Sequence, residues 1–283
     1  MNGTSNEYKY LVASDLDGTL LAKADTISEE NRGAIEKMAE LGICFAPCSG
    51  RTFYEMPECI RNDPNIRYYI GSDGASVWEK KNGGIEKIIN SSMDQKEAHR
   101  ILDILDDYEN LPTVRSDGHS YVNARQCCDD AFAYHRMGRL YGKFVKYYSE
   151  PKEDFSSFVR QLSEVEMMCI FFRTDAQMND CKRRIEALGE YKVTSSEPTN
   201  MEIVSNRAGK GKGMTRLAEC LHIPHSKTVA VGDSKNDLDM LNTAYLPLAM
   251  ENASDEVKSV AKRTICHYKE HSAKYILENI LEL

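Results

Sequence analysis

The feature that most limits the possible folds is an apolar strand pattern at residues 8–14, followed by a helix pattern and a second strand pattern at residues 43–47. Ser28 is a good helix N-cap, and apolar residues recur at helical spacing from Ile35 until Gly42 ends the helix. Strand, helix and strand within about forty residues form a βαβ unit, which favours a parallel sheet. We therefore expect an α/β fold.

The end of the chain repeats this pattern, whereas the middle does not. A helix at about residues 213–221 precedes a strand at 228–231, a helix near Asn236 precedes a short strand at 245–249, and two helices follow. Between residues 88 and 196, helices and strands alternate without the βαβ rhythm. We expect a Rossmann-like parallel-sheet core domain at residues 1–87 and 197–283, with an inserted α+β domain at residues 88–196.

The composition excludes several classes of function. A net charge of −8 gives the chain an overall field that repels nucleic acid and anionic membranes. No stretch approaches the roughly 20 apolar residues that span a bilayer. The nine cysteines include no Cys-x-x-Cys pair, and we interpret most of them as small buried side chains. We expect a cytoplasmic protein, and the sequence leaves its oligomeric state open.

Two aspartates, Asp15 and Asp17, directly follow the first strand in the motif Asp-Leu-Asp-Gly-Thr at residues 15–19. Side chains at the carboxyl end of a parallel strand project into the crevice where α/β sheets bind ligands. Such a pair suits phosphoryl transfer, in which one oxygen attacks phosphorus and another group moves a proton. Standing alone, the motif would be equally consistent with an ordinary Asp-Gly turn.

A second acidic motif, Gly-Asp-Ser-Lys-Asn-Asp at residues 232–237, follows a later strand and opens a helix. Asp233 and Asp237 can therefore meet Asp15 at the same strand ends. Carboxylates in one place repel one another unless a cation neutralises them, and oxygen ligands at a phosphate site indicate Mg²⁺. The alternative is a helix start rich in capping residues.

Two further motifs offer groups that bind phosphate. Cys-Ser-Gly-Arg at residues 48–51 ends the second strand, where the Ser49 hydroxyl and the backbone N–H groups around Gly50 are natural donors to phosphate oxygens. Gly-Lys-Gly-Lys-Gly at residues 209–213 lacks the Walker spacing, which argues against a nucleotide P-loop. A lysine at that helix entrance can neutralise both phosphate and nucleophile. For Lys212 we prefer the alternative of a solvated basic turn.

In this order, the four motifs resemble those of the haloacid dehalogenase-like hydrolases. The likeness is close to the Cof-type phosphatases, which carry a class IIB α+β cap between the second and third motifs. It extends through Ala-Met-Glu-Asn-Ala at residues 249–253 and covers the whole chain. The resemblance implies that Asp15 is the nucleophile, that Asp17 is the general acid/base and that Lys210, by its spacing to the following helix, is the phosphate-site lysine.

The resemblance also implies the remaining roles. Mg²⁺ is expected on Asp15, the backbone carbonyl of Asp17 and Asp233, with Asp237 in the metal shell. The phosphoryl group is expected on Ser49, Gly50 and Lys210, supported by Asn236. The chain departs from the family at two positions, because Ser49 replaces a usual Thr and Asp73 replaces a usual Asn.

The resulting hypothesis is Mg²⁺-dependent hydrolysis of a small phosphorylated metabolite, such as a sugar phosphate, through an aspartyl-phosphate on Asp15. A phosphomutase on the same scaffold stays open as an alternative. A non-catalytic phosphate-binding protein is the third possibility, against which the presence of both Asp15 and Asp17 argues. Four residues of the insertion are candidates for substrate contact, although such residues are more often surface or structural: Arg115, His119, Arg125 and Arg173.

Overall fold

The computed structural model describes residues 8–21, 25–81, 83–196 and 198–281, and the chain divides into two compact units. The core unit is Met1–Asn90 with Gly209–Leu283, and the cap unit is Ser91–Ala208. The domain boundaries predicted after residues 87 and 196 therefore move to residues 90 and 208. The second boundary moves further because β13 (Asn200–Ser205) pairs with β11 (Met167–Phe172), a strand of the cap sheet.

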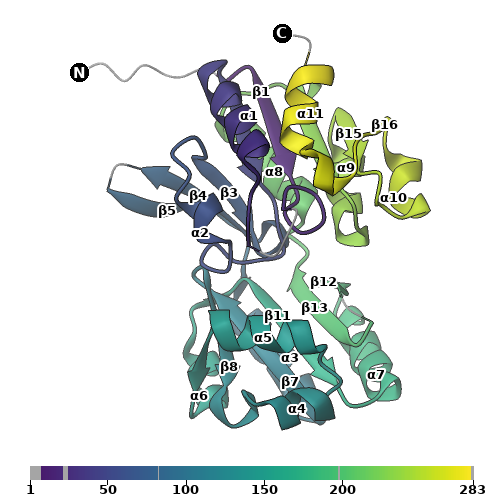
Figure 1. Ribbon diagram of the computed structural model, residues 1–283. Coiled ribbons are helices and arrows are strands. Elements are labelled where there is room, and N and C mark those ends of the chain that lie inside the picture. The colour runs from purple at the N-terminus through teal and green to yellow at the C-terminus, as the bar shows by residue number, and fades with distance from the viewer. Residues whose placement is uncertain (1–7, 22–24, 82, 197, 282–283) are drawn as a thin grey trace. The chain divides into compact units, whose positions relative to one another are not determined.

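A five-stranded parallel sheet forms the centre of the core unit (Figure 1). Its strand order is β16-β15-β14-β1-β2, so the first strand lies between two strands from opposite ends of the chain. The four strands predicted for this sheet are present as β1 (Tyr10–Ser14), β2 (Ile43–Pro47), β14 (Thr228–Gly232) and β15 (Leu246–Ala249), whereas the fifth, β16 (Arg263–Thr264), was not predicted.

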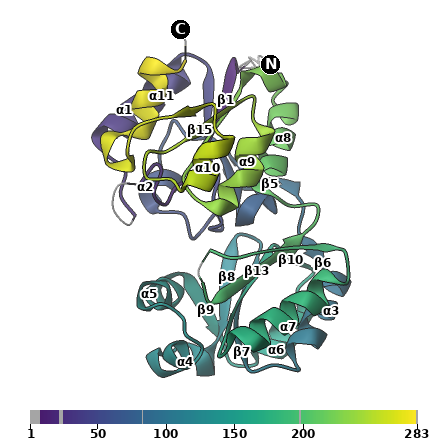
Figure 2. The same ribbon diagram turned by 90° about the vertical axis from the view of Figure 1, so that its right-hand side faces the viewer.

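Helices cover both faces of this sheet (Figure 2). Val12 packs in the cluster that contains residues of α1 (Glu29–Glu40) and α11 (Ser272–Asn279). Leu11 points the other way, into the cluster of α8 (Lys210–Cys220), α9 (Leu238–Thr243) and α10 (Asp255–Val260). This alternation is the two-residue period of a strand that is buried on both faces. The predicted N-cap is confirmed, because the Ser28 side chain accepts a hydrogen bond from the backbone N–H of Asn31.

Beyond β2 the core unit carries an antiparallel sheet of order β3-β4-β5. The sequence predicts a short strand at residues 68–70, which is present as β3 (Tyr68–Gly71), whereas β4 (Ser76–Lys81), which pairs with β3, and β5 (Gly84–Asn90), which pairs with β4, were not predicted. A parallel bridge between Cys48 and Ile70 joins β3 to the end of β2. The short elements of this unit are α2 (Glu58–Arg61), η1 (Ser72–Gly74), η3 (His225–Lys227), η4 (Lys235–Asp237) and η5 (Tyr268–Glu270).

The cap unit is an α+β structure built on a six-stranded sheet of order β12-β13-β11-β7-β8-β9. All neighbouring strands in it are antiparallel except β8 and β9. The helices α3, α6 and α7 cover one face, and α4 and α5 cover part of the other. The remaining bounds are β6 (Met93–Asp94), α3 (Gln95–Leu105), β7 (Asn110–Ser116), β8 (His119–Asn123), η2 (Ala124–Gln126), α4 (Asp129–Tyr134), α5 (Arg139–Tyr148), β9 (Ser149–Lys152), α6 (Phe155–Gln161), β10 (Glu164–Val165), α7 (Asp175–Glu186) and β12 (Tyr191–Thr194).

The predicted fold class, a parallel-sheet α/β core with an inserted α+β unit, is confirmed. Within the described part of the chain, no helix combines the length and the apolar character needed to cross a membrane.

Candidate active site

The predicted acidic residues converge where β1 and β14 end. The backbone N–H of Asp15 donates to the carbonyl of Val231 at 3.0 Å, which continues the pairing of β1 with β14 beyond the last residue of β1. On the other side, the N–H of Cys48 donates to the carbonyl of Ser14 at 2.7 Å. The chain at Ser14 and Asp15 is therefore held by both neighbouring strands, at the edge of the sheet where α/β proteins bind ligands.

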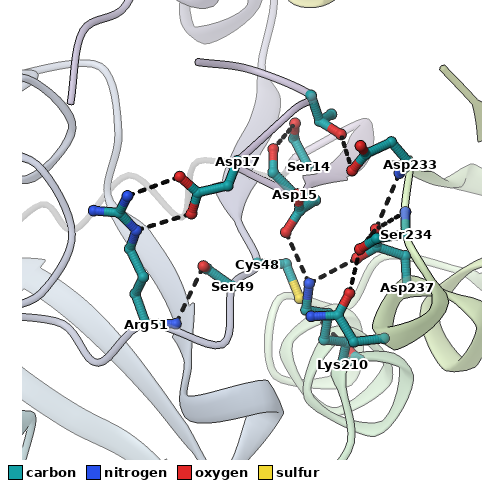
Figure 3. Close-up of polar contacts among 12 residues, drawn as sticks. Ser14, Asp15, Asp17, Cys48, Ser49, Arg51, Lys210, Asp233, Ser234 and Asp237 are labelled. Atoms are coloured by element: carbon teal, nitrogen blue, oxygen red, sulfur yellow. Dashed lines mark hydrogen bonds and ion pairs between the residues drawn. The ribbon is translucent and has the colours of Figure 1, made fainter. Parts of the chain in front are cut away.

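Lys210 joins two of these carboxylates (Figure 3). Its Nζ lies 2.8 Å from Asp15 Oδ1 and 2.6 Å from Asp237 Oδ1, and the lysine side chain is fully buried. Burial raises the pKa of Asp15 well above its ordinary value, and Asp237 adds to the rise while Lys210 opposes it. Burial also acts to lower the pKa of Lys210, but Asp15 and Asp237 outweigh it and raise that pKa. The lysine therefore stays charged, as a buried cation between carboxylates does.

Asp233 completes the acidic cluster. Its backbone N–H and that of Ser234 both donate to Asp237 Oδ2 at 3.0 Å, which fixes the loop after β14. Burial and the charge of Asp237 raise the pKa of Asp233 to about 6. Gly18, with φ +84°, is required opposite this carboxylate, because a Cβ there would lie 2.5 Å from Asp233 Oδ2.

Asp15, Asp233 and Asp237 form a group that fits a hard divalent cation. Each offers one carboxylate oxygen, and these oxygens all lie within 4.8 Å of one another. Lys210 offsets only part of the charge of three carboxylates, and Mg²⁺ prefers such oxygen ligands. The side chain of Asp17 is not part of this group, which agrees with a metal contact through its backbone carbonyl only.

The Asp17 side chain points toward Arg51, whereas Asp15 points toward Lys210 (Figure 3). Two hydrogen bonds join the guanidinium and the carboxylate, from Arg51 Nε to Asp17 Oδ2 at 2.9 Å and from Arg51 Nη2 to Asp17 Oδ1 at 2.7 Å. Arg51 also donates to Asp25 Oδ1 at 2.8 Å. Arg51 belongs to the motif at residues 48–51, but the motif alone predicted no role for it.

Lys210 begins α8, and the other predicted phosphate-binding residues lie on two different loops. Ser49 is buried after β2, and its Oγ accepts a hydrogen bond from the N–H of Arg51 at 3.2 Å, with Gly50 between them. Asn236 stays within the loop after β14, where its Oδ1 accepts from the Ser234 hydroxyl at 2.5 Å. Lys210 therefore contacts Asp15 directly, whereas the hydrogen bond of Asn236 stays within its own loop.

Comparison with known proteins decides the family. Residues 12–277 match the family of haloacid dehalogenase-like hydrolases. The chain belongs to this family.

This haloacid dehalogenase-like hydrolase is similar in sequence to a named phosphatase and in structure to two solved proteins. The 5-amino-6-(5-phospho-D-ribitylamino)uracil phosphatase YwtE of Bacillus subtilis is 27% identical, over 95% of this chain and 97% of its own. A haloacid dehalogenase-like hydrolase structure from B. subtilis has a TM-score of 0.79 at 25% identity, covering 96% of this chain and 100% of that one. The HAD subclass IIB sugar phosphatase BT4131 has a TM-score of 0.77 at 19% identity, covers 94% and 97% of the two chains, and shows the fold alone. The predicted family and the predicted enzyme class, a phosphatase, are confirmed.

Two residues of this hydrolase were missed as site residues. Asn252 donates from Nδ2 to Asp233 Oδ2 and to the Gly18 carbonyl, both at 3.0 Å, and Thr19 Oγ1 donates to Asp233 Oδ1 at 3.4 Å. Both orient the carboxylate from outside its own loop. The sequence carries a signal for each, because Thr19 lies in the motif at residues 15–19 and Asn252 in the motif at residues 249–253.

Proposed function

We propose that this protein hydrolyses small phosphate monoesters with Mg²⁺ through an aspartyl-phosphate on Asp15. The observation that carries the proposal is the buried Asp15–Lys210–Asp237 arrangement at the ends of β1 and β14. A carboxylate held beside a buried ammonium group and a divalent-cation site is suited to attack phosphorus, because the charge on the phosphoryl oxygens is offset there.

In the proposed first step, a carboxylate oxygen of Asp15 attacks phosphorus and the ester P–O bond breaks. The leaving alcohol oxygen takes a proton from Asp17. In the second step, water gives a proton to Asp17 as its oxygen attacks phosphorus, which releases Asp15 and inorganic phosphate. Ser49, the N–H groups around Gly50, and Asn236 would hold the phosphoryl oxygens together with Lys210.

Mg²⁺ would be held by Asp15, Asp233, Asp237 and the backbone carbonyl of Asp17. When bound, it would supply positive charge to the phosphoryl oxygens. The pairing of Asp17 with Arg51 has a consequence for this scheme. Because proton transfer requires the Asp17 carboxyl to reach the leaving oxygen, the side chain must give up at least part of its two-point contact with Arg51 during turnover.

For the substrate, we propose a sugar phosphate or related small phosphometabolite in the cytoplasm. One relative supports this class, since YwtE is named for a phosphoribityl compound. The net charge of −8 also supports a small metabolite over nucleic acid as the partner.

The test is phosphate release from a panel of phosphometabolites with Mg²⁺, by wild type and Asp15→Asn. We expect the variant to fall to background and a labelled wild-type intermediate, trapped by acid quench, to carry phosphate on Asp15. Asp63→Asn is the matched control, because Asp63 is another buried aspartate of the core unit and accepts a hydrogen bond from Asn65. Phosphate on another residue would refute the mechanism, and isomerised substrate without free phosphate would favour the phosphomutase.

A further inference from the structure

The helix that carries Lys210 begins without a cap of its own. α8 starts at Lys210, and the residue before it, Gly209, has no side chain that could accept a hydrogen bond. The first N–H groups of a helix have no partner inside the helix, so they need acceptors from elsewhere. The proposed mechanism gives the glycines on either side of Lys210 no role, although they belong to the motif at residues 209–213.

Asp239, in the first turn of α9, supplies such an acceptor. The backbone N–H of Gly211 donates to Asp239 Oδ2 at 3.0 Å. Gly211 is the second residue of α8, and the N–H at this position is one of the two that an N-cap side chain ordinarily binds. The carboxylate thus lies at the amino ends of both helices, where the helix dipoles favour a negative charge. A side chain of α9 therefore takes the place of the missing cap of α8.

The glycines on either side of Lys210 make room for this contact. α8 and α9 lie side by side and pack in the same apolar cluster (Figure 2). A Cβ on Gly209 would collide with Asp239 Oδ2, and a Cβ on Gly211 would lie 2.5 Å from the Asp239 carbonyl oxygen. Any larger residue at either position would push the two helices apart. The spacing Gly-Lys-Gly therefore brings the start of α8 against Asp239.

One short segment of the chain holds Lys210 at both ends. Asp237, which directly precedes α9, lies 2.6 Å from the Lys210 ammonium group, and Asp239 binds the N–H of the residue after Lys210. The lysine reaches Asp15 through a flexible side chain, so the position of its Nζ depends on the backbone from which that side chain starts. Because helix ends fray, a first turn without a cap would hold that backbone less firmly.

We infer that Asp239 is a positioning residue for phosphoryl transfer: by capping α8, it keeps the Lys210 ammonium group against Asp15. This inference rests on the proposed function. Asp239 acts through the backbone of α8 and takes no part in making or breaking bonds. Because the role requires only a hydrogen-bond acceptor of the right length, asparagine can fill it, whereas alanine cannot.

Two other roles for Asp239 would give different results. If Asp239 only stabilised the packing of α8 on α9, its loss would lower the free energy of unfolding and leave kcat of the folded enzyme unchanged. If it acted by holding the loop of Asp237, its loss would weaken Mg²⁺ binding at the proposed metal site. Activity, stability and Mg²⁺ affinity are therefore measured on the same variants.

The variants are Asp239→Ala, Asp239→Asn and Ser28→Ala. Ser28→Ala is the matched control, because Ser28 caps α1, a helix of the same unit that carries none of the proposed site residues. Release of phosphate from an aryl phosphate at saturating Mg²⁺ gives kcat and KM, calorimetry gives the Mg²⁺ affinity, and urea unfolding shows that each variant is folded in the assay. If Asp239→Ala does not fold, Asp239→Ser replaces it, because the serine hydroxyl is one bond too short to take the place of Oδ2.

For Asp239→Ala we expect kcat to fall by roughly 10–100-fold, because a displacement of about 1 Å in a catalytic group can cost about 100-fold. Its Mg²⁺ affinity should match that of wild type. Asp239→Asn should keep most of the wild-type kcat, since asparagine caps helices about as well as aspartate. Ser28→Ala should lose stability and keep its kcat.

Four results would overturn the inference while phosphate release by wild type left the proposed function intact. They are a wild-type kcat in folded Asp239→Ala, equal losses of kcat in Asp239→Ala and Asp239→Asn, an equal loss in Ser28→Ala, and a loss of Mg²⁺ affinity that parallels the loss of kcat. If wild type released no phosphate from any ester, the proposed function would fail and the inference with it.

Discussion

Replacing Lys210 with methionine is the most direct test of how the site is held together. The lysine side chain is fully buried, as is that of Asp237, and the side chain of Asp15 is 7% exposed. Methionine has a similar volume and no charge, so the substitution removes the cation from two contacts of 2.8 and 2.6 Å without a large cavity.

The expected loss of stability in the absence of metal is roughly 3–5 kcal/mol, the range for removing one partner from a buried ion pair. The loss should depend on pH. Without the ammonium group, the already raised pKa of Asp15 rises further, so the folded variant holds protons that the unfolded chain releases. The deficit relative to wild type is therefore largest near about pH 8 and shrinks as the pH falls toward about 6. Mg²⁺ should also reduce it, because the ion offsets the same carboxylates.

Urea unfolding followed by tryptophan fluorescence gives the measurement. Trp78 is the single tryptophan of the chain and is buried in β4, so the signal reports on the core unit. Lys212→Met is the matched control, since Lys212 lies two residues along the same helix and is exposed, and we expect a change within about 0.5 kcal/mol. A Lys210→Met deficit below about 1 kcal/mol, or one that is the same at both pH values, would refute this account of the buried cluster.

Three further outcomes are expected. Asp17→Asn should slow hydrolysis of alkyl phosphates by roughly 10²–10⁴-fold, with a smaller effect on an activated aryl phosphate, and equal losses on both would count against proton transfer by Asp17. A chelator should abolish phosphate release. The apparent Mg²⁺ affinity, measured by calorimetry, should fall as the pH drops through about 6, where Asp233 takes up a proton, and an Mg²⁺ affinity that does not change with pH would contradict this. Gly74→Ala should destabilise the core unit by more than about 1–2 kcal/mol, because the φ of Gly74 is +81° and the new Cβ would lie 2.1 Å from the Gly209 carbonyl oxygen. Gly83→Ala is the control: its Cβ would meet nothing within 4 Å, so its stability in the same urea assay should be nearly that of wild type.

The sequence was informative wherever a local pattern and a chemical motif coincided. Ser28 and the apolar spacing after it defined α1, and the acidic motifs after two apolar strands were enough to bring Asp15 and Asp233 together. The start of α8 was placed three residues late, at Gly213 rather than Lys210, because two of the first four residues of that helix are glycines, which are poor helix formers.

Other features depend on contacts that no local pattern records. The pairing of Asp17 with Arg51 joins residues 34 positions apart and follows from the loop after β2 rather than from either motif. β5 was missed because every residue in it is at least partly exposed. The helix α5, by contrast, carries an apolar stripe at helical spacing, so its pattern could have predicted it: Tyr141, Phe144, Val145 and Tyr148.

The position of β1 between β2 and β14 also governs the order in which the protein can be made. A chain emerging from the ribosome delivers Asp15 early, but β14, Asp233 and the lysine that contacts Asp15 follow only after the whole cap unit, Ser91–Ala208, has been synthesised. The cap unit is continuous in sequence and can complete its sheet first, whereas the core must keep one edge of β1 unpaired until residues 228–232 arrive. Until then the nascent protein carries Asp15, its proposed nucleophile, without Asp233 and Asp237, so on the proposed mechanism the active site is completed in the last fifth of translation.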